Sequence, residues 1–276
     1  MSHYLHYVRR EVVVTPDPRS PSPAFAETQE ADRGLSAPEF HSAPATGSAS
    51  RVMPGDTIWL FSQLIGPWGR LLPALDARIE VAEVRRISRE NKMRCRYAAG
   101  TGSCWFALSD ARSLLSTLHA RRADGTRTPI IQHPRMAVGQ SLRLLRRADD
   151  ASPLLEYAED LDARGQDFVS YRLIDGTRDA FALVERLLHE GRSVFWDRWS
   201  LPRRLAERRE TIDDAALDAF IAGQIRRSTR VHGILSPRYA DPDSYSYRER
   251  MLAEQLGVFV PHPFADLTST TARHPQ

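Results

Sequence analysis

The chain has almost no lysine: Lys92 is the only one among 38 Lys and Arg residues, and the rest are arginine. With 35 Asp and Glu residues the formal net charge is only +3, so bulk charge does not by itself indicate a nucleic-acid-binding protein. The arginine bias is better explained by a GC-rich coding sequence than by selection for bidentate phosphate recognition.

Cysteine is also scarce. Cys95 and Cys104 are the only two, and no Cys–His cluster has metal-ligand spacing, so the sequence predicts no zinc site. A cross-strand disulfide between them is conceivable, but two free thiols in a reducing compartment are favoured.

Long apolar runs are absent. No segment approaches the ~18 residues of a membrane-spanning helix, and the first 14 residues lack the basic, apolar and small-residue regions of a signal peptide. We therefore expect a cytoplasmic protein without a membrane partner.

The hydrophobic fraction of 42% over 276 residues is sufficient for one large or two ordinary globular domains. Residues 15–50 are the exception, since Pro, Ser, Ala and charged residues replace large apolar ones. Such a segment cannot offset its ordering entropy by burial, so it is predicted to be a disordered insertion or linker.

The first domain, predicted over residues 1–14 and 51–162, is β-rich α+β. Its expected strands cover 4–14, 57–64, 77–87, 92–99 and 103–108, and its expected helices cover 109–121, with Ser109 as N-cap, and 152–165. Together these elements predict a small barrel.

Within this domain, the succession "PGDTIWL" and "DARIEVAEV" resembles the PUA/EVE-like barrels. The resemblance implies binding of RNA or modified bases, with a nucleotide or nucleic acid as a trigger. Trp59, Trp68 and Trp105 then either line a base-stacking pocket or pack in the core, and packing is the favoured reading.

The second domain, predicted over residues 163–276, alternates strands and helices. Strands are expected at 166–173, 192–197, 230–236 and 258–263, with helices at 178–191, from 213, and at 244–257. This alternation predicts a parallel sheet with helices on both faces, and ligands of such sheets bind beyond the carboxyl ends of the strands.

Six pieces of this domain follow one another in a fixed order: Ser170-Tyr171-Arg172, Gly191, Val194 to Asp197, Ser228, Ser236 to Tyr239, and Ser244 to Glu249. In this order they resemble the Toll/interleukin receptor (TIR) family, a flavodoxin-like α/β fold. The chain departs from the family in having Tyr245-Ser246 for the usual Trp-Cys, an Arg-rich loop after Asp197, and no evident fifth strand.

The resemblance implies an NAD⁺ hydrolase that cleaves the nicotinamide–ribose bond, with NAD⁺ as substrate and no cofactor or metal. Glu249 occupies the position of the catalytic glutamate. It further implies a bacterial anti-phage effector that assembles into a homo-oligomer on activation. The substrate-binding residues carried over by position are Ser170, Tyr171, Arg172, Trp196, Asp197, Trp199, Ser236, Tyr239 and Tyr245, and loop arginines such as Arg203 would meet the pyrophosphate.

Three alternatives stay open. Glu249 is an ordinary solvated helix carboxylate paired with a nearby arginine; or the domain is a non-enzymatic scaffold that recruits partners through Arg203 and Arg204; or the first domain reads nucleic acid and the second only signals. The sequence does not decide the trigger, the oligomeric state, or whether the product is linear or cyclic ADP-ribose.

Overall fold

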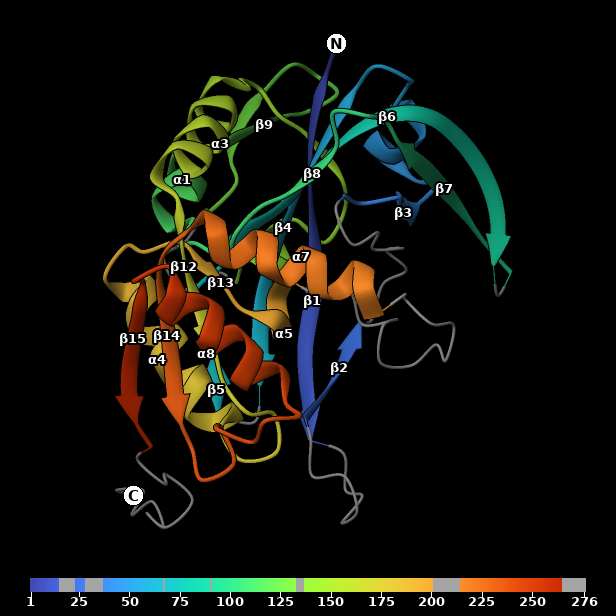
Figure 1. The fold of residues 1–276 in the computed structure, drawn as a ribbon. Coiled ribbons are helices and arrows are strands. Elements are labelled where there is room, and N and C mark those ends of the chain that lie inside the picture. Colours follow the sequence, from blue (N-terminus) through green and yellow to red (C-terminus); the bar gives the residue numbers. More distant parts are fainter. Residues whose placement is uncertain are drawn as a thin grey trace, which may run out of the picture.

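The computed structural model describes residues 1–14, 23–27, 37–66, 68–89, 91–132, 137–200 and 214–264. Within this part of the chain the protein is mixed α/β, with a curled mixed sheet in the first half and a parallel sheet in the second (Figure 1). None of the described helices is both long and apolar enough to cross a membrane.

The first half is dominated by a sheet in which hydrogen-bonded neighbours follow the order β11-β1-β4-β6-β7-β3, with β2, β5 and β8 attached to its strands. Its strands are β1 (His3–Val14), β2 (Pro23–Glu27), β3 (Phe40–Pro44), β4 (Thr57–Gly66), β5 (Gly69–Arg70), β6 (Ala74–Arg89), β7 (Lys92–Ala99), β8 (Cys104–Trp105) and β11 (Arg146–Arg147). A separate hairpin joins β9 (His119–Arg121) to β10 (Arg127–Pro129), and the helices are η1 (Gly47–Arg51), α1 (Arg112–Thr117), α2 (Val138–Ser141) and α3 (Ser152–Arg164).

The prediction that all of residues 15–50 form a disordered linker is wrong for part of that segment. Residues 40–44 form β3, which pairs antiparallel with β7 from Phe40↔Ala98 to Pro44↔Arg94, and residues 23–27 form β2 against β1. The strands form because β7 and β1 supply the backbone partners, a contribution that composition alone cannot reveal. Residues 37–39 and 45–50 are also described, with residues 47–50 in η1, and the other residues of the predicted linker lie outside the described part.

The predicted N-cap at Ser109 is also wrong. The N-cap is Ala111, two residues later, and the helix begins at Arg112, whose backbone N–H donates to the Asp110 carboxylate at 2.9 Å. The helix then ends at Thr117, and residues 119–121 become β9.

The second half contains a four-stranded sheet of order β13-β12-β14-β15, in which every pairing is parallel. In chain order this is 2-1-3-4. Its strands are β12 (Gln166–Ser170), β13 (Val194–Phe195), β14 (Ser228–Leu235) and β15 (Phe259–Pro263); its helices are α4 (Thr177–His189), α5 (Asp197–Ser200), α7 (Asp214–Arg227) and α8 (Tyr245–Gln255).

Helices cover both faces of this sheet, as the alternation predicts. Successive side chains of β12 separate into two clusters: Phe168 packs with Ile225 of α7 and Ala253 of α8, whereas Val169 packs with Val184 of α4. In Figure 1, α7 and α8 accordingly lie in front of the sheet. Because β12 and β14 are parallel neighbours, the loops that follow them lie at the same edge of the sheet.

The two halves share one hydrophobic cluster. Leu64 of β4 and Leu108 from the first half pack in the same cluster as Val169 and Val194 from the second. Leu108 and Val194 also exchange both backbone hydrogen bonds, at 3.0 and 2.8 Å. The parallel sheet is thus fixed to the curled sheet by buried apolar contacts and backbone pairing.

Candidate functional site

The end of β12 brings three predicted site residues into one hydrogen-bonded chain. Tyr239 Oη donates to Ser170 Oγ at 2.9 Å, and Ser170 Oγ donates to Glu249 Oε2 at 2.6 Å. Ser170 and Tyr239 are each 1% exposed. Residues 79 apart in sequence therefore meet at the carboxyl end of a parallel strand, where such folds place their ligands.

A close approach between backbone and side chain makes this chain of hydrogen bonds possible. Gly233 of β14 lies opposite Ser170 in the register of β12 and β14. A Cβ atom at this position would lie 2.7 Å from Tyr239 Oη and 2.5 Å from the Phe259 ring. Only glycine leaves room for the Tyr239 hydroxyl beneath the strand.

Glu249 is placed by the start of α8. Ser244 caps the helix, since its Oγ accepts from the Tyr247 backbone N–H at 3.1 Å and donates to the Asp241 carbonyl at 2.6 Å. Ser246 Oγ donates to the Tyr239 carbonyl at 3.0 Å and so ties the first turn to the β14 loop. The Tyr245-Ser246 departure from the TIR pattern thus supplies a hydroxyl that fixes the helix.

The Glu249 carboxyl has a pKa raised from its ordinary value of 4.5 to about 7. Desolvation is the largest cause, because burial disfavours the charged form; the Ser170 hydrogen bond lowers the pKa and the Asp197 charge raises it. An acid with such a pKa exchanges protons near neutral pH, which is the property expected of a general acid–base or electrostatic catalyst.

Asp197 reaches the same edge from the start of α5. Its Oδ1 accepts a hydrogen bond from Tyr171 Oη at 2.7 Å, and Arg198 Nε donates to the same Tyr171 oxygen at 3.0 Å. Burial raises the pKa of Tyr171 well above its ordinary value, so the hydroxyl stays protonated and continues to donate. The Asp197 charge also raises the pKa of the Glu249 carboxyl across this edge.

Other predicted residues are held by partners that the sequence did not suggest. Arg172 forms an ion pair with Asp241 at 3.6 Å, and its Nε is buried with no hydrogen-bond partner among the described atoms. Ser236 Oγ donates to Asp175 Oδ1 at 2.6 Å. These contacts tie together the loops that follow β12 and β14.

The aromatic residues divide between core and surface. Trp196 and Trp199, both predicted to bind substrate, are 0% and 1% exposed and pack in the hydrophobic cluster shared by the two halves. Tyr245 is 37% exposed, and the Arg248 guanidinium lies 4.3 Å above its ring centroid. Tyr245 is thus the one aromatic residue among the predicted substrate-binding residues whose ring is exposed.

The tryptophans of the first half pack against hydrophobic neighbours, as the favoured interpretation of the sequence predicts. Trp59 is fully buried, donates from Nε1 to His3 Nδ1 at 3.1 Å, and stacks with Phe106. Trp68 packs against Phe181. Trp105 is half-buried in the junction between the two halves. Base stacking is therefore not supported at these positions.

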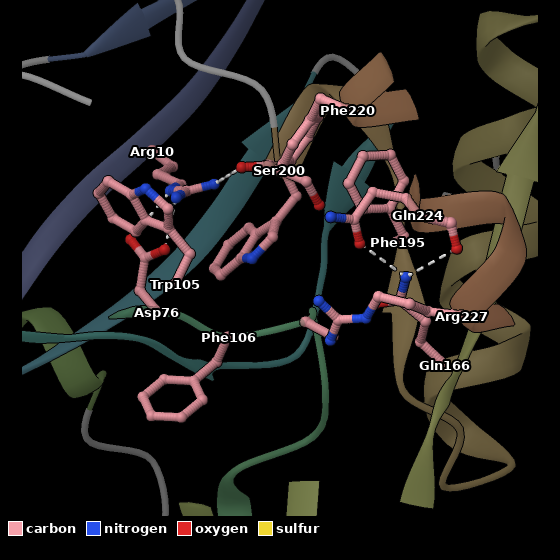
Figure 2. A pocket seen from close by; sticks show the side chains of 12 residues that line it. Arg10, Asp76, Trp105, Phe106, Gln166, Phe195, Ser200, Phe220, Gln224 and Arg227 are labelled. Carbon is pink, nitrogen blue, oxygen red and sulfur yellow. Dashed lines mark hydrogen bonds and ion pairs between the residues drawn. The ribbon is translucent and has the colours of Figure 1, made fainter. Parts of the chain in front are cut away.

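That junction contains a small cavity of about 80 Å³ (Figure 2). Arg10 and Asp76 lie on one side and Gln166 and Gln224 on the other; Gln166 Nε2 donates to Gln224 Oε1 at 2.9 Å. Gln166 is at the amino end of β12, so this cavity is at the opposite end of the strand from Ser170 and is separate from the Glu249 site.

Reasoning from sequence missed Gly233, Asp241 and Asp175 as parts of the site. For Gly233 a signal existed, because an isolated glycine in the apolar run "RVHGIL" indicates a close backbone approach. Arg203 and Arg204, proposed for the pyrophosphate or a partner, lie outside the described residues. The described residues contain no group of three His, Cys, Asp or Glu side chains arranged to hold a metal ion, and Cys95 and Cys104 are free thiols.

Comparison of the chain with protein-family models, with curated proteins and with solved structures finds no match to any of them. The case for a function therefore rests on the residues of the site.

Proposed function

We propose that this protein cleaves the N-glycosidic bond between nicotinamide and ribose in NAD⁺, with Glu249 as the catalytic carboxylate. The observation that carries the proposal is the Glu249 carboxyl itself, desolvated at the carboxyl edge of a parallel sheet with a pKa of about 7 and held by Ser170. The TIR resemblance supplies the substrate class.

The strand order supports the fold part of the proposal. The order 2-1-3-4 is that of the first four strands of flavodoxin-like sheets, which bind ligands at the switch point between strands 1 and 3. Here strands 1 and 3 are β12 and β14; Ser170 is the last residue of β12, and Ser236 follows β14 directly. That the first half is a PUA/EVE-like barrel is likewise a proposal, and it rests on the sequence resemblance.

The chemistry requires one carboxylate. When the C1′–N bond breaks, its electron pair leaves with nicotinamide, which departs neutral and needs no acid. The ribose becomes oxocarbenium-like, and the ionised Glu249 stabilises this charge. Water then adds to C1′ and gives its proton to the Glu249 carboxylate, which returns it to solvent.

The surrounding groups position the ribose and phosphates. Ser170 holds one oxygen of Glu249, leaving the other for a ribose hydroxyl or the attacking water. Arg172 offers a guanidinium for the pyrophosphate, and the exposed Tyr245 ring offers a face for nicotinamide or adenine. As in assembled TIR enzymes, a second copy of the chain is proposed to complete the pocket, so activity should rise with protein concentration.

The test is nicotinamide release from NAD⁺, followed by chromatography over a range of protein concentrations. We expect Glu249→Gln to lower the rate at least 100-fold, because it removes the charge and keeps the shape. Glu254→Gln is the matched control on the same helix: it breaks an exposed ion pair with Arg250 and should leave the rate within about twofold.

Equal rates for the wild type and Glu249→Gln would remove Glu249 from the mechanism. No nicotinamide release by the wild type at any concentration, including assembled protein, would select the non-enzymatic scaffold instead.

A further inference from the structure

A second, larger cavity lies in the first half, away from Glu249. It has a volume of about 1030 Å³ and is formed by the start of β1, the segment around η1, the β9–β10 hairpin and the segment from α2 to β11. Six arginines line it: Arg51, Arg121, Arg122, Arg143, Arg146 and Arg147. In a chain of net charge +3, so many arginines around one concavity is a strong local concentration of positive charge.

Most of this charge is available to a ligand. Arg121 is paired with Asp149 at 2.8 Å, and Arg122 lies near Asp124. The other four, Arg51, Arg143, Arg146 and Arg147, form no ion pair with an acidic residue in the part of the chain that the structure describes. Unpaired guanidinium groups around a cavity favour an anionic occupant.

The one acidic residue among the lining side chains is already engaged. Asp56 is 8% exposed, and its two carboxylate oxygens accept backbone hydrogen bonds from Ser2 at 2.7 Å and from Met53 at 2.9 Å. Asp56 therefore ties the start of β1 to the turn at Met53, and it forms no ion pair with a cavity arginine among the described residues.

The cavity also carries exposed apolar side chains. Met1, Met53 and Leu144 line it and are 84%, 66% and 55% exposed, so large apolar groups stand in water beside the arginines. An inorganic phosphate would gain nothing from them, whereas a ligand with flat apolar faces between its phosphates would cover them. Exposed apolar side chains gathered at a concave site indicate binding.

We propose that this cavity binds a single-stranded oligonucleotide, whose phosphates pair with the arginines and whose bases cover Met1, Met53 and Leu144. Guanidinium groups suit phosphate oxygens because they donate two parallel hydrogen bonds. The volume is at the upper limit of about 300–1,000 Å³ for small-molecule pockets, which favours several linked nucleotides over one. The site is not the tryptophan pocket considered from the sequence.

The test is fluorescence anisotropy of a labelled single-stranded tetranucleotide with the full-length chain. We expect Arg143→Glu with Arg147→Glu to weaken binding at least 30-fold. The control pair, Arg86→Glu with Arg226→Glu, makes the same change in net charge on exposed arginines outside the cavity and should weaken binding less than threefold. In a plot of log affinity against log salt concentration, the double arginine variant should have a shallower slope than the wild type. The difference should be about 0.7 for each phosphate contact that the substitutions remove.

A second variant tests the bases separately. Leu144→Ser should weaken binding of the tetranucleotide about three- to tenfold. The affinity for tripolyphosphate, measured by competition, should stay unchanged. If the double arginine variant does not fold, Arg51→Glu with Arg122→Glu replaces it, because these two arginines line other parts of the cavity. This pair should also weaken tetranucleotide binding at least 30-fold. All of these measure binding, so they stand apart from nicotinamide release.

Three results would overturn the proposal. Binding weakened equally by the control pair would mean bulk attraction only. Displacement by ATP or by tripolyphosphate at the same concentration as an unlabelled tetranucleotide would mean a mononucleotide or simple anion site. No measurable binding of the tetranucleotide at low salt would leave the cavity without its proposed ligand.

Discussion

At the scale of single residues, the charge of Glu249 is set by competing neighbours. Burial raises the pKa of its carboxyl, the hydrogen bond from Ser170 lowers it, and the Asp197 charge raises it again. The folded protein therefore holds a proton on Glu249 up to about pH 7, whereas the unfolded chain releases it near 4.5. The stability contributed by this group is complete below pH 4.5 and is lost as the pH rises through 7.

The stability of Glu249→Gln should differ from that of the wild type in a pH-dependent way. Glutamine stays neutral, so the variant should be more stable than the wild type by roughly 1–3 kcal/mol at pH 8 and by much less at pH 5. Urea unfolding at both values measures the difference, and Glu254→Gln should show no such pH dependence. A Glu249→Gln difference that is the same at pH 5 and pH 8 would mean that the carboxyl is not desolvated.

At the scale of elements, the site depends on how closely β12, β14 and the loop after β14 approach one another. Gly233 lets the Tyr239 ring lie against the strand, and the Tyr239 hydroxyl then orients Ser170. In this protein, Ser170 and Tyr239 form a hydrogen bond because Gly233 has no side chain to occupy the space of the Tyr239 hydroxyl.

Gly233→Ala should destabilise the protein by about 1–3 kcal/mol, because the new Cβ overlaps the Phe259 ring and the Tyr239 hydroxyl. Gly223→Ala in α7 is the opposite case: nothing lies within 4 Å of a Cβ there, and alanine is the better helix former. We expect that control to stabilise by about 0.5–1 kcal/mol. Chemical denaturation compares the two, and equal effects would contradict the steric account.

How far the sequence predicts the elements depends on the source of their stability. Where burial patterns decide, as in β4, β6, α3 and α4, the alternation or helical period predicts them to within a few residues. The strand β3 was missed because its stability comes from pairing with β7. The hydrogen bonds from Tyr239 through Ser170 to Glu249 were beyond prediction, because they depend on side-chain distances across the sheet.

At the scale of the whole molecule, one buried arginine of the first half also binds the second half. The Arg10 guanidinium of β1 binds Asp76 of β6, with Nε 3.1 Å from Oδ2, and Ser62 donates to the same carboxylate at 2.7 Å. Arg10 also donates to the Trp199 carbonyl of α5 and lies 3.9 Å from the Trp199 ring centroid. The parallel pairing of β1 with β4, which the sequence did not predict, brings Arg10 to this position.

Arg10→Met should lower the free energy of unfolding by about 3–5 kcal/mol, because Asp76 stays buried without its guanidinium. Arg10→Met combined with Asp76→Asn should lose much less than the sum of the single changes. The control, Arg164→Met, removes an exposed ion pair with Asp160 and should cost under about 1 kcal/mol. Strict additivity in this double-mutant cycle would show that the pair is not coupled.

Strand β1 runs from the arginine-rich cavity to the junction between the two halves. Tyr4 of β1 lines the arginine-rich cavity, and Arg10, six residues further on and about 20 Å away at 3.3 Å per residue, holds the backbone next to Asp197. Nine consecutive register pairs with β4 prevent the strand from stretching between them. A displacement of the strand at Tyr4 is therefore transmitted to the Arg10 contact with the Trp199 carbonyl, which belongs to the second half.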